Sequence, residues 1–187
     1  KNKNGLGKKR FIVSRIYNLI IACFFISILN AQNIIPSKDE IMNPAYVTAK
    51  KDNKNVFLMF DASWCTWCKR MDKNMSNDLC KDFFDDNYVI VHLAVNEYPE
   101  ENKKLENPGA VDFYNSLRGD ANGIPFWIIF DSEGNVLDNS LDPNGNNIGS
   151  PVTKDEVEAF TAILKGTSSL KEKDLNIITE VFWDKNR

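Results

Sequence analysis

The sequence predicts an α/β fold in which a central mixed β-sheet carries helices on both faces. Short apolar runs of strand length alternate with segments of helical periodicity along most of the chain. These runs are apolar at nearly every position, which is typical of strands buried on both faces. The last two strands are separated by a short glycine-containing turn, which predicts an antiparallel hairpin. A chain of 187 residues, 43% of them apolar, is sufficient for one domain with its own core.

The first predicted elements are a helix and a strand. The sequence SKDE at Ser37–Glu40 is a capping box, and Asn43 and Pro44 suit a cap and a first helical position. A helix is therefore expected to extend to about Lys51. The continuous apolar run at Val56–Phe60 then predicts a central buried strand.

A helix and three further strands are predicted next. Met71 and Met75 recur at helical spacing behind a pair of cysteines, and Tyr88–Val95 is a β-branched, apolar run that predicts a second strand. The sequence FWIIFDSEGNVLD, residues 126–138, predicts the hairpin. Residues 97–123 and 141–151 are polar connections, the first with a short helix expected around Val111–Leu117.

The C-terminal part predicts two helices. The sequence TKDE at Thr153–Glu156 is a second capping box, and Gly166 is expected to end the helix that it starts. An amphipathic segment follows, with one apolar face made of Leu175, Ile178 and Phe182. We expect one domain over residues 32–187, with residues from about 167 onward as a C-terminal helical extension.

The N-terminal segment has the pattern of a secretory signal peptide. Its basic residues are Lys1, Lys3, Lys8, Lys9, Arg10 and Arg15, and the uncharged apolar run Leu19–Leu29 follows them. This run is shorter than the ~20 residues of a membrane span. We therefore expect residues 1–31 to be removed after Ala31 and the protein to be exported. Two alternatives are a membrane anchor that tolerates Arg15 and a lipoprotein modified at Cys23, although the apolar residues after Cys23 disfavour lipidation.

Charge and cysteine content exclude some functions. Six of the 23 lysines and arginines lie in residues 1–31, so the remaining 17 face 26 acidic residues, a net charge of about −9. Such a chain has no basic stripe for phosphates, and we expect no nucleic-acid partner. Three cysteines remain after residue 31, Cys65, Cys68 and Cys80, which is not the framework of a disulfide-stapled domain. The close pair instead indicates redox chemistry.

The position of the CxxC pair predicts the role of each cysteine. A cysteine that follows a strand and opens a helix lies among unpaired backbone N–H groups, which stabilise its thiolate. Cys65 is therefore the expected nucleophile, and Cys68, one helical turn later, is expected to resolve a mixed disulfide and to be the more shielded of the two. Lys69 and Arg70 add positive potential. Trp64 and Trp67 suit an exposed rim that holds an extended client chain. Core packing explains Trp64 equally well, whereas Trp67, between the cysteines, is expected to be exposed.

Two sequence motifs resemble the thioredoxin family. They are FLMFDASWCTWCK, which contains the CxxC, and GIPFWIIFDSEGNV about fifty-five residues later. The resemblance spans roughly Ala45 to Leu164 and is closest to exported members with a W-C-x-x-C-K core. It implies a thioredoxin-like fold and a thiol–disulfide oxidoreductase that uses a Cys65–Cys68 disulfide without a further cofactor. Its expected partners are exported proteins with disulfides and an electron donor that the sequence does not identify.

The resemblance also assigns client-binding residues and exposes departures. It implies that Pro125 is a cis proline facing the dithiol and that Ile124 offers its backbone to an extended substrate. Met59 stands where the family often has a buried carboxylate. Asp61 and His92 are the candidate proton relay in its place, because His92 matches a buried lysine of the family; an ordinary hydrogen-bonded histidine is the alternative for His92.

Other functions compete with this hypothesis. Cys65, Cys68, Cys80 and His92 have the composition of a Cys₃His zinc site. The long spacing to Cys80 disfavours it, and the apolar face of Leu79, Phe83 and Phe84 predicts a core helix with Cys80 as a small buried residue, so we expect no metal. A non-catalytic module that binds peptides with the tryptophans and Ile124 is the remaining alternative. For an enzyme, we expect reduction of client disulfides rather than oxidation.

Overall fold

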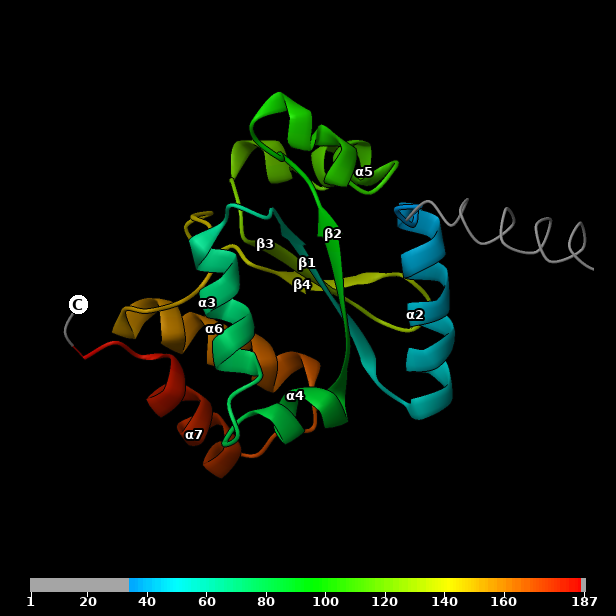
Figure 1. Cartoon of the computed structure of the whole chain (residues 1–187). Helices are drawn as coiled ribbons and strands as arrows, with labels where there is room; N and C mark the ends of the chain where they lie inside the picture. The colour runs from blue at the N-terminus through cyan, green and yellow to red at the C-terminus, as the bar shows by residue number, and fades with distance from the viewer. Residues whose placement is uncertain (1–33, 186–187) are drawn as a thin grey trace, which may run out of the picture. The chain divides into compact units, whose positions relative to one another are not determined.

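The described residues, 34–185 of the computed structural model, build a four-stranded sheet in the order β2–β1–β3–β4 (Figure 1). Strand β1, Asn55–Asp61, pairs in parallel with β2, Tyr88–Ala94, and antiparallel with β3, Phe126–Phe130. The hairpin partner β4, Val136–Asn139, pairs antiparallel with β3. The sheet is therefore mixed, and the predicted strands and hairpin are confirmed.

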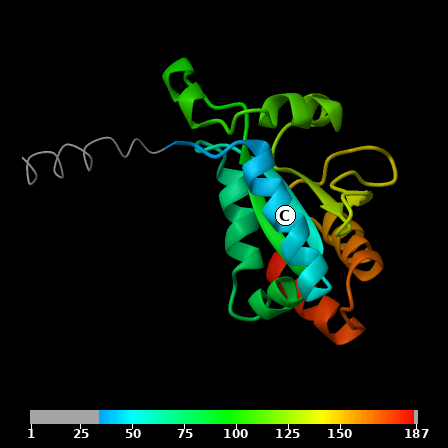
Figure 2. The same ribbon diagram turned by 90° about the vertical axis from the view of Figure 1, so that its right-hand side faces the viewer.

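Helices cover both faces of this sheet, as Figures 1 and 2 show. Helices α2, Lys38–Asp52, and α5, Ala110–Ser116, pack on the face formed by Val56, Leu58 and Phe60 of β1. The opposite face carries Phe57 and Met59, and its helices are α3, Thr66–Met75, α4, Lys81–Asn87, α6, Lys154–Thr167, and α7, Glu172–Phe182. Because successive strand residues point to opposite faces, a strand buried on both sides needs the apolar run seen in the sequence.

Helix α2 starts at the predicted capping box and passes through Pro44. Ser37 is the N-cap, and its backbone N–H donates to Glu40 Oε2 at 2.8 Å. The expected start at Asn43 and Pro44 is wrong, because Pro44 lies inside α2. The box at Ser37 has already capped the helix. The loss of the Pro44 N–H is tolerated because Met42, Ala45 and Ala49 bury one side of the helix against the sheet.

The helix α6 confirms its capping box but not its predicted end. Thr153 accepts from the Glu156 N–H, while the Glu156 side chain accepts from the Thr153 N–H. Gly166 does not end the helix, which includes Thr167. Thr167 is buried, and its carbonyl accepts from Asn55 Nδ2 at 2.7 Å, so tertiary contacts extend the last turn past the glycine.

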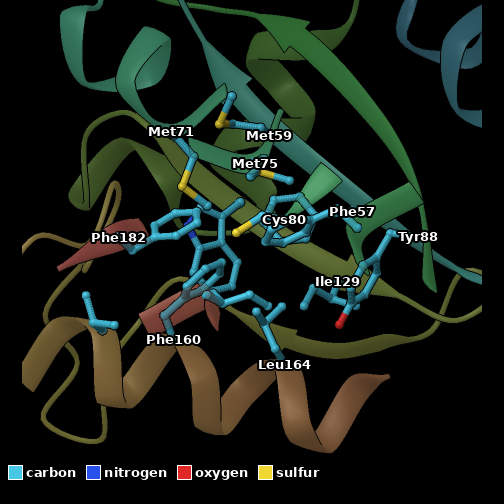
Figure 3. Close-up of a cluster of buried hydrophobic side chains, with 14 of the residues drawn as sticks. Phe57, Met59, Met71, Met75, Cys80, Tyr88, Ile129, Phe160, Leu164 and Phe182 are labelled. Atoms are coloured by element: carbon cyan, nitrogen blue, oxygen red, sulfur yellow. The ribbon is translucent and has the colours of Figure 1, made fainter. Parts of the chain in front are cut away.

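The C-terminal helix α7 is an integral part of the core on the α3 face. Leu175, Ile178 and Phe182 are buried as their spacing predicted, and the Phe182 ring lies 5.1 Å from the Phe160 ring (Figure 3). On this face Cys80 is fully buried, with Phe84 in the same cluster.

The predicted apolar face around Cys80 needs one correction. Leu79 is 65% exposed, so it does not join the core. The chain turns between α3 and α4, where the Leu79 N–H donates to Asn77 Oδ1 at 3.0 Å. Leu79 therefore precedes the helix that contains Phe84, and helical spacing does not place it on the same face.

The polar connection after β2 contains short helical segments. The 3₁₀ helices η1, Glu100–Leu105, and η2, Gly119–Ala121, flank α5, which confirms the expected short helix. The expected signal peptide, residues 1–31, lies outside the described residues. Within residues 34–185, no helix has the length and apolar character to cross a membrane.

Candidate active site

The two cysteines of the CxxC lie where the chain passes from β1 into α3. Cys65 is the N-cap of α3, and its N–H donates to Ala62 O at 2.9 Å. Cys68 is in the first turn of the helix, and the two sulfur atoms form a disulfide. In this form both residues are buried, with exposed fractions of 3% for Cys65 and 2% for Cys68. Burial of the disulfide form therefore does not separate the nucleophile from the resolving cysteine.

Local hydrogen bonds do distinguish them. The Cys68 N–H points at Cys65 Sγ at 3.1 Å, so one of the free amides at the start of α3 already faces this sulfur. After reduction the same amide can stabilise a Cys65 thiolate. Lys69 Nζ donates to Ser63 O at 2.6 Å, and the Arg70 guanidinium lies 3.6 Å from a carboxylate oxygen of Asp184. Both basic side chains are thus engaged beside the dithiol.

Both tryptophans of the motif are exposed on the surface around the disulfide. Trp64 is 50% exposed, and its indole N–H donates to Asn96 O at 2.9 Å. Trp67 is 40% exposed, and the Arg70 guanidinium lies 5.8 Å from the centre of its ring. Because neither ring is buried in the core, both are available to contact another polypeptide.

The loop before β3 meets the disulfide from the other side. The Ile124–Pro125 peptide bond is cis, as the resemblance implied, and Ile124 packs against the cluster of Ala62, Cys65 and Cys68. Asn147 holds this loop, since its side-chain amide donates to Asn122 O at 2.9 Å and to Pro125 O at 3.0 Å.

A groove of about 310 Å³ runs beside this loop. Its walls include Trp67, Ile124, Pro125, Ile148 and Val152. The structure therefore brings four predicted client-contact positions, the two tryptophans and the Ile124–Pro125 pair, to the surroundings of one disulfide.

The candidate proton relay forms a cluster on the α3 face of the sheet. β1 and β2 pair without a bulge, so Asp61, Met59 and the Met59 partner His92 face the same side. His92 Nδ1 donates to Asp61 Oδ2 at 2.8 Å, and its Nε2 lies 3.6 Å from Asp72 Oδ1 of α3. The sequence did not indicate Asp72.

The charge state of this cluster follows from its contacts. Burial alone lowers the pKa of the His92 imidazole. The hydrogen bond to Asp61 and the negative charges of Asp72 and Asp61 outweigh it and raise the pKa above the usual 6.5. Burial also raises the pKa of the Asp72 carboxyl, against the opposing effect of His92.

This cluster predicts a pH-dependent contribution to stability. Because the folded-state pKa of His92 is raised, its protonated form stabilises the fold fully below pH 6.5, and the contribution is lost as the pH rises through the folded-state pKa. Urea unfolding of the wild type and of His92→Gln, compared at pH 6 and pH 9, should show the larger difference at pH 6. A difference that is equal at both pH values, or larger at pH 9, would contradict this.

The four residues of the alternative zinc site do not come together in the described part of the chain. Cys65 and Cys68 form a disulfide, and Cys80 is buried in the hydrophobic core. Among residues 34–185, the group whose ligand atoms lie within 4.8 Å of one another is Asp61, Asp72 and His92. Their ligand atoms could hold a divalent cation. Without one, His92 already pairs with both carboxylates, through a hydrogen bond to Asp61 and a longer contact with Asp72.

Cys80 is predicted to be chemically inert in the native state. Burial raises the pKa of its thiol to about 11, so almost no thiolate forms at neutral pH. In a Cys65→Ser/Cys68→Ser background, native Cys80 should react with iodoacetamide at least tenfold more slowly than in urea. Fast labelling of the native protein would instead show an accessible third thiol.

Glu97 and Asn147 are site residues that sequence reasoning missed. Glu97 is 3% exposed and accepts from the backbone N–H and the hydroxyl of Ser63, two residues before Cys65. A usable signal existed for Glu97, because β1 and β2 are parallel and their carboxyl ends meet at one edge. Polar residues that follow β2 are therefore placed beside the residues that follow β1. For Asn147 we find no such signal, because it lies in a polar turn.

A mixed sheet of this strand order, with a CxxC disulfide opening the helix after β1 and a cis-proline loop against it, defines a thiol–disulfide oxidoreductase of the thioredoxin-like type. Sequence comparison supports the same class. Residues 42–144, more than half of the chain, match the family described as Thioredoxin-like domain, and the chain belongs to that family.

Several solved structures are similar to the chain. A disulphide isomerase from Xylella fastidiosa Temecula1 shares 24% identity over 52% of this chain and 69% of its own, with a TM-score of 0.42. A DsbH oxidoreductase shares 22% identity over 73% of this chain and 91% of its own, with a TM-score of 0.41. A thiol:disulfide interchange protein from Chlorobium tepidum TLS shares 20% identity over 64% of this chain and 83% of its own, with a TM-score of 0.38. Among curated proteins, no match was found.

Proposed function

We propose that this protein is an exported thiol–disulfide oxidoreductase that reduces disulfides in client proteins. The observation that carries the proposal is the Cys65–Cys68 disulfide at the start of α3, with the Cys68 amide directed at Cys65 Sγ. A dithiol in this position can cycle between oxidised and reduced forms without any change of fold. Export rests on the basic and apolar pattern of residues 1–31.

The proposed reaction proceeds in two exchanges. The Cys65 thiolate attacks one sulfur of a client disulfide, which forms a Cys65–client mixed disulfide and releases the other client sulfur as a thiolate. The Cys68 thiolate then attacks Cys65 Sγ, which restores the Cys65–Cys68 disulfide and releases the second client thiol. The client gains two electrons and the enzyme loses two, so a dithiol reductant must reduce the enzyme before the next turnover.

The surroundings of the disulfide support a protein as the client. Trp64 and Trp67 present exposed rings, and the groove beside Ile124 and Pro125 can accept an extended chain. In the proposal, the backbone of Ile124 hydrogen-bonds the client segment. In the proposal, Asp61, His92 and Asp72 act as a proton relay. They take up the proton that the Cys68 thiol loses before the second exchange, and they release it to solvent on the α3 side.

The reducing direction is supported by the electrostatics of the site. A strongly oxidising dithiol needs a highly stabilised thiolate. Here the Cys68 amide faces Cys65, while Lys69 and Arg70 are directed to Ser63 O and to Asp184. We therefore expect a potential nearer the ~−270 mV of thioredoxin than the ~−120 mV of a strong oxidant.

The redox potential is the measurement that tests this proposal. Tryptophan fluorescence in dithiothreitol and glutathione buffers should give a two-electron transition below about −200 mV. With dithiothreitol as reductant, the wild type should accelerate insulin reduction, and Cys65→Ser should lose at least 99% of this acceleration. A potential near −120 mV would assign the oxidising direction instead.

A peptide-binding module without catalysis is the second candidate, and the exposed tryptophan rim favours it. Binding by the rim and groove does not require the nucleophile. If wild type and Cys65→Ser bind a client peptide equally while neither accelerates insulin reduction, this function replaces the enzymatic one.

A further inference from the structure

A buried carboxylate holds the segment that leads into the dithiol helix. Glu97 follows β2 and is only 3% exposed. Ser63 engages both of its oxygens, since the Ser63 N–H donates to Oε1 and the Ser63 hydroxyl donates to Oε2, each at 2.7 Å. Hydrogen bonds to an ionised carboxylate are among the stronger ones in proteins, so this pair fixes the backbone and the side chain of Ser63 together.

Asn96, the residue before Glu97, restrains Trp64 through its backbone carbonyl. Asn96 has a φ of +54°, in the left-handed region, and its carbonyl accepts from the Trp64 indole N–H at 2.9 Å. Asn96 and Glu97 thus restrain two successive residues, Ser63 and Trp64, immediately before Cys65. We call the contacts between these two residue pairs the 63–97 clasp.

Further contacts keep the clasp in place. The Glu97 N–H donates to Glu106 Oε1 at 2.9 Å, and the same oxygen accepts from Lys103 Nζ at 2.8 Å. On the other side, Lys69 Nζ donates to Ser63 O at 2.6 Å. A buried charge is costly unless it is fully hydrogen-bonded, and the loop could be packed with apolar side chains instead. Packing alone therefore does not explain why a carboxylate is buried in the clasp.

We propose that Glu97 is a positioning residue that fixes Trp64 for contact with polypeptide clients and thereby makes the dithiol favour protein disulfides over small ones. The inference rests on the proposed function. A polypeptide must cover the rim around Cys65, whereas a small disulfide needs to reach only the sulfur. A ring held in place before binding loses less conformational freedom when a client covers it, so its restraint favours the larger substrate.

Two disulfide substrates separate positioning from a general structural role. The experiment measures the reduction of insulin and of oxidised glutathione by the wild type, Glu97→Ala and Glu97→Gln, with dithiothreitol as the reductant. The ratio of kcat/KM for insulin to kcat/KM for glutathione disulfide should fall about fivefold in Glu97→Ala, mainly through a higher KM for insulin. Glu97→Gln should recover most of the ratio, because its amide oxygen still accepts from the Ser63 N–H. Glu158→Gln, which neutralises an exposed carboxylate on α6, is the matched control and should keep the wild-type ratio.

The outcomes are distinguishable. If Glu97→Ala lowers both values equally, or changes neither, the inference is overturned while the proposed function stands. If Glu97→Ala does not fold, Ser63→Ala takes its place, since it removes only the hydroxyl contact and should still lower the ratio; an unchanged ratio overturns the inference. A wild type that reduces neither disulfide overturns the proposed function, and the inference with it.

Discussion

Replacing Cys68 with serine is expected to turn this protein into a trap for its clients. Cys65 in this variant can still attack a client disulfide, but the variant lacks the neighbouring thiol that would release the mixed disulfide. Cys80 cannot substitute for Cys68, because it is fully buried in the core on the α3 face (Figure 3). Covalent complexes should therefore accumulate at least tenfold above the wild-type level.

The matched variant Cys65→Ser should accumulate far fewer complexes. It keeps a thiol in the same motif, but Cys68 does not occupy the N-cap. Within residues 34–185, no amide donates to the Cys68 sulfur as the Cys68 N–H does to Cys65 Sγ. Both variants are expressed as the full chain, alkylated rapidly, and separated on gels with and without dithiothreitol. Equal trapping by the two variants would show that the proposed division of roles between the cysteines is wrong.

The strands were predictable because their chemistry is local. Val56–Phe60 is apolar at every position, and the structure shows why: alternate residues enter two different cores on the two faces of the sheet. The CxxC pair was predictable for a similar reason. Its place after a strand and before a helical segment puts Cys65 at the start of a helix. The helix N-terminus near its sulfur is therefore a local feature that the sequence shows directly.

Helix ends were less predictable where tertiary contacts compete with local signals. Asn43 and Pro44 satisfy the local rules for a helix start, yet the capping box at Ser37 begins the helix earlier. Gly166 satisfies the rule for a helix end, yet Asn55 bonds to the Thr167 carbonyl and extends the turn. In both cases burial against the sheet outweighs a local preference, which is about 3 kcal/mol against a proline inside a helix and about 1 kcal/mol against a glycine.

Site residues that depend on contacts between elements were only partly predictable. Asp61 and His92 were identified one by one, but their meeting with Asp72 depends on the register of β1 and β2 and on the rotation of α3. Neither the strand register nor the rotation of the helix can be read directly from the sequence. Glu97 lies in the same category. Its place after β2 indicates that it lies beside the residues that follow β1, but its burial and its contacts with Ser63 depend on how the two segments dock.

Trp127 connects the core to the groove beside Ile124 and Pro125, and its removal should have the largest effect on stability. Its ring is fully buried. It stacks on the Phe57 ring, with 5.2 Å between the ring centres, and it meets the Phe160 ring edge-on, with 5.5 Å between the ring centres. The indole N–H donates to Gly149 O at 2.8 Å, in the segment that lines the groove. One side chain therefore joins β3, α6 and the wall of the groove.

Trp127→Ala is expected to lower the free energy of unfolding by about 3–5 kcal/mol, because it leaves a large cavity between the sheet and α6. Trp127→Phe keeps an aromatic ring but leaves Gly149 O without the indole donor, so its loss should be smaller, about 1–3 kcal/mol. Trp64→Ala is the matched control, since that ring is 50% exposed, and it should cost less than about 1 kcal/mol. Urea titrations of the oxidised proteins give all three values. A loss for Trp127→Ala no greater than that for Trp64→Ala would contradict the role of Trp127 as the link between the core and the groove.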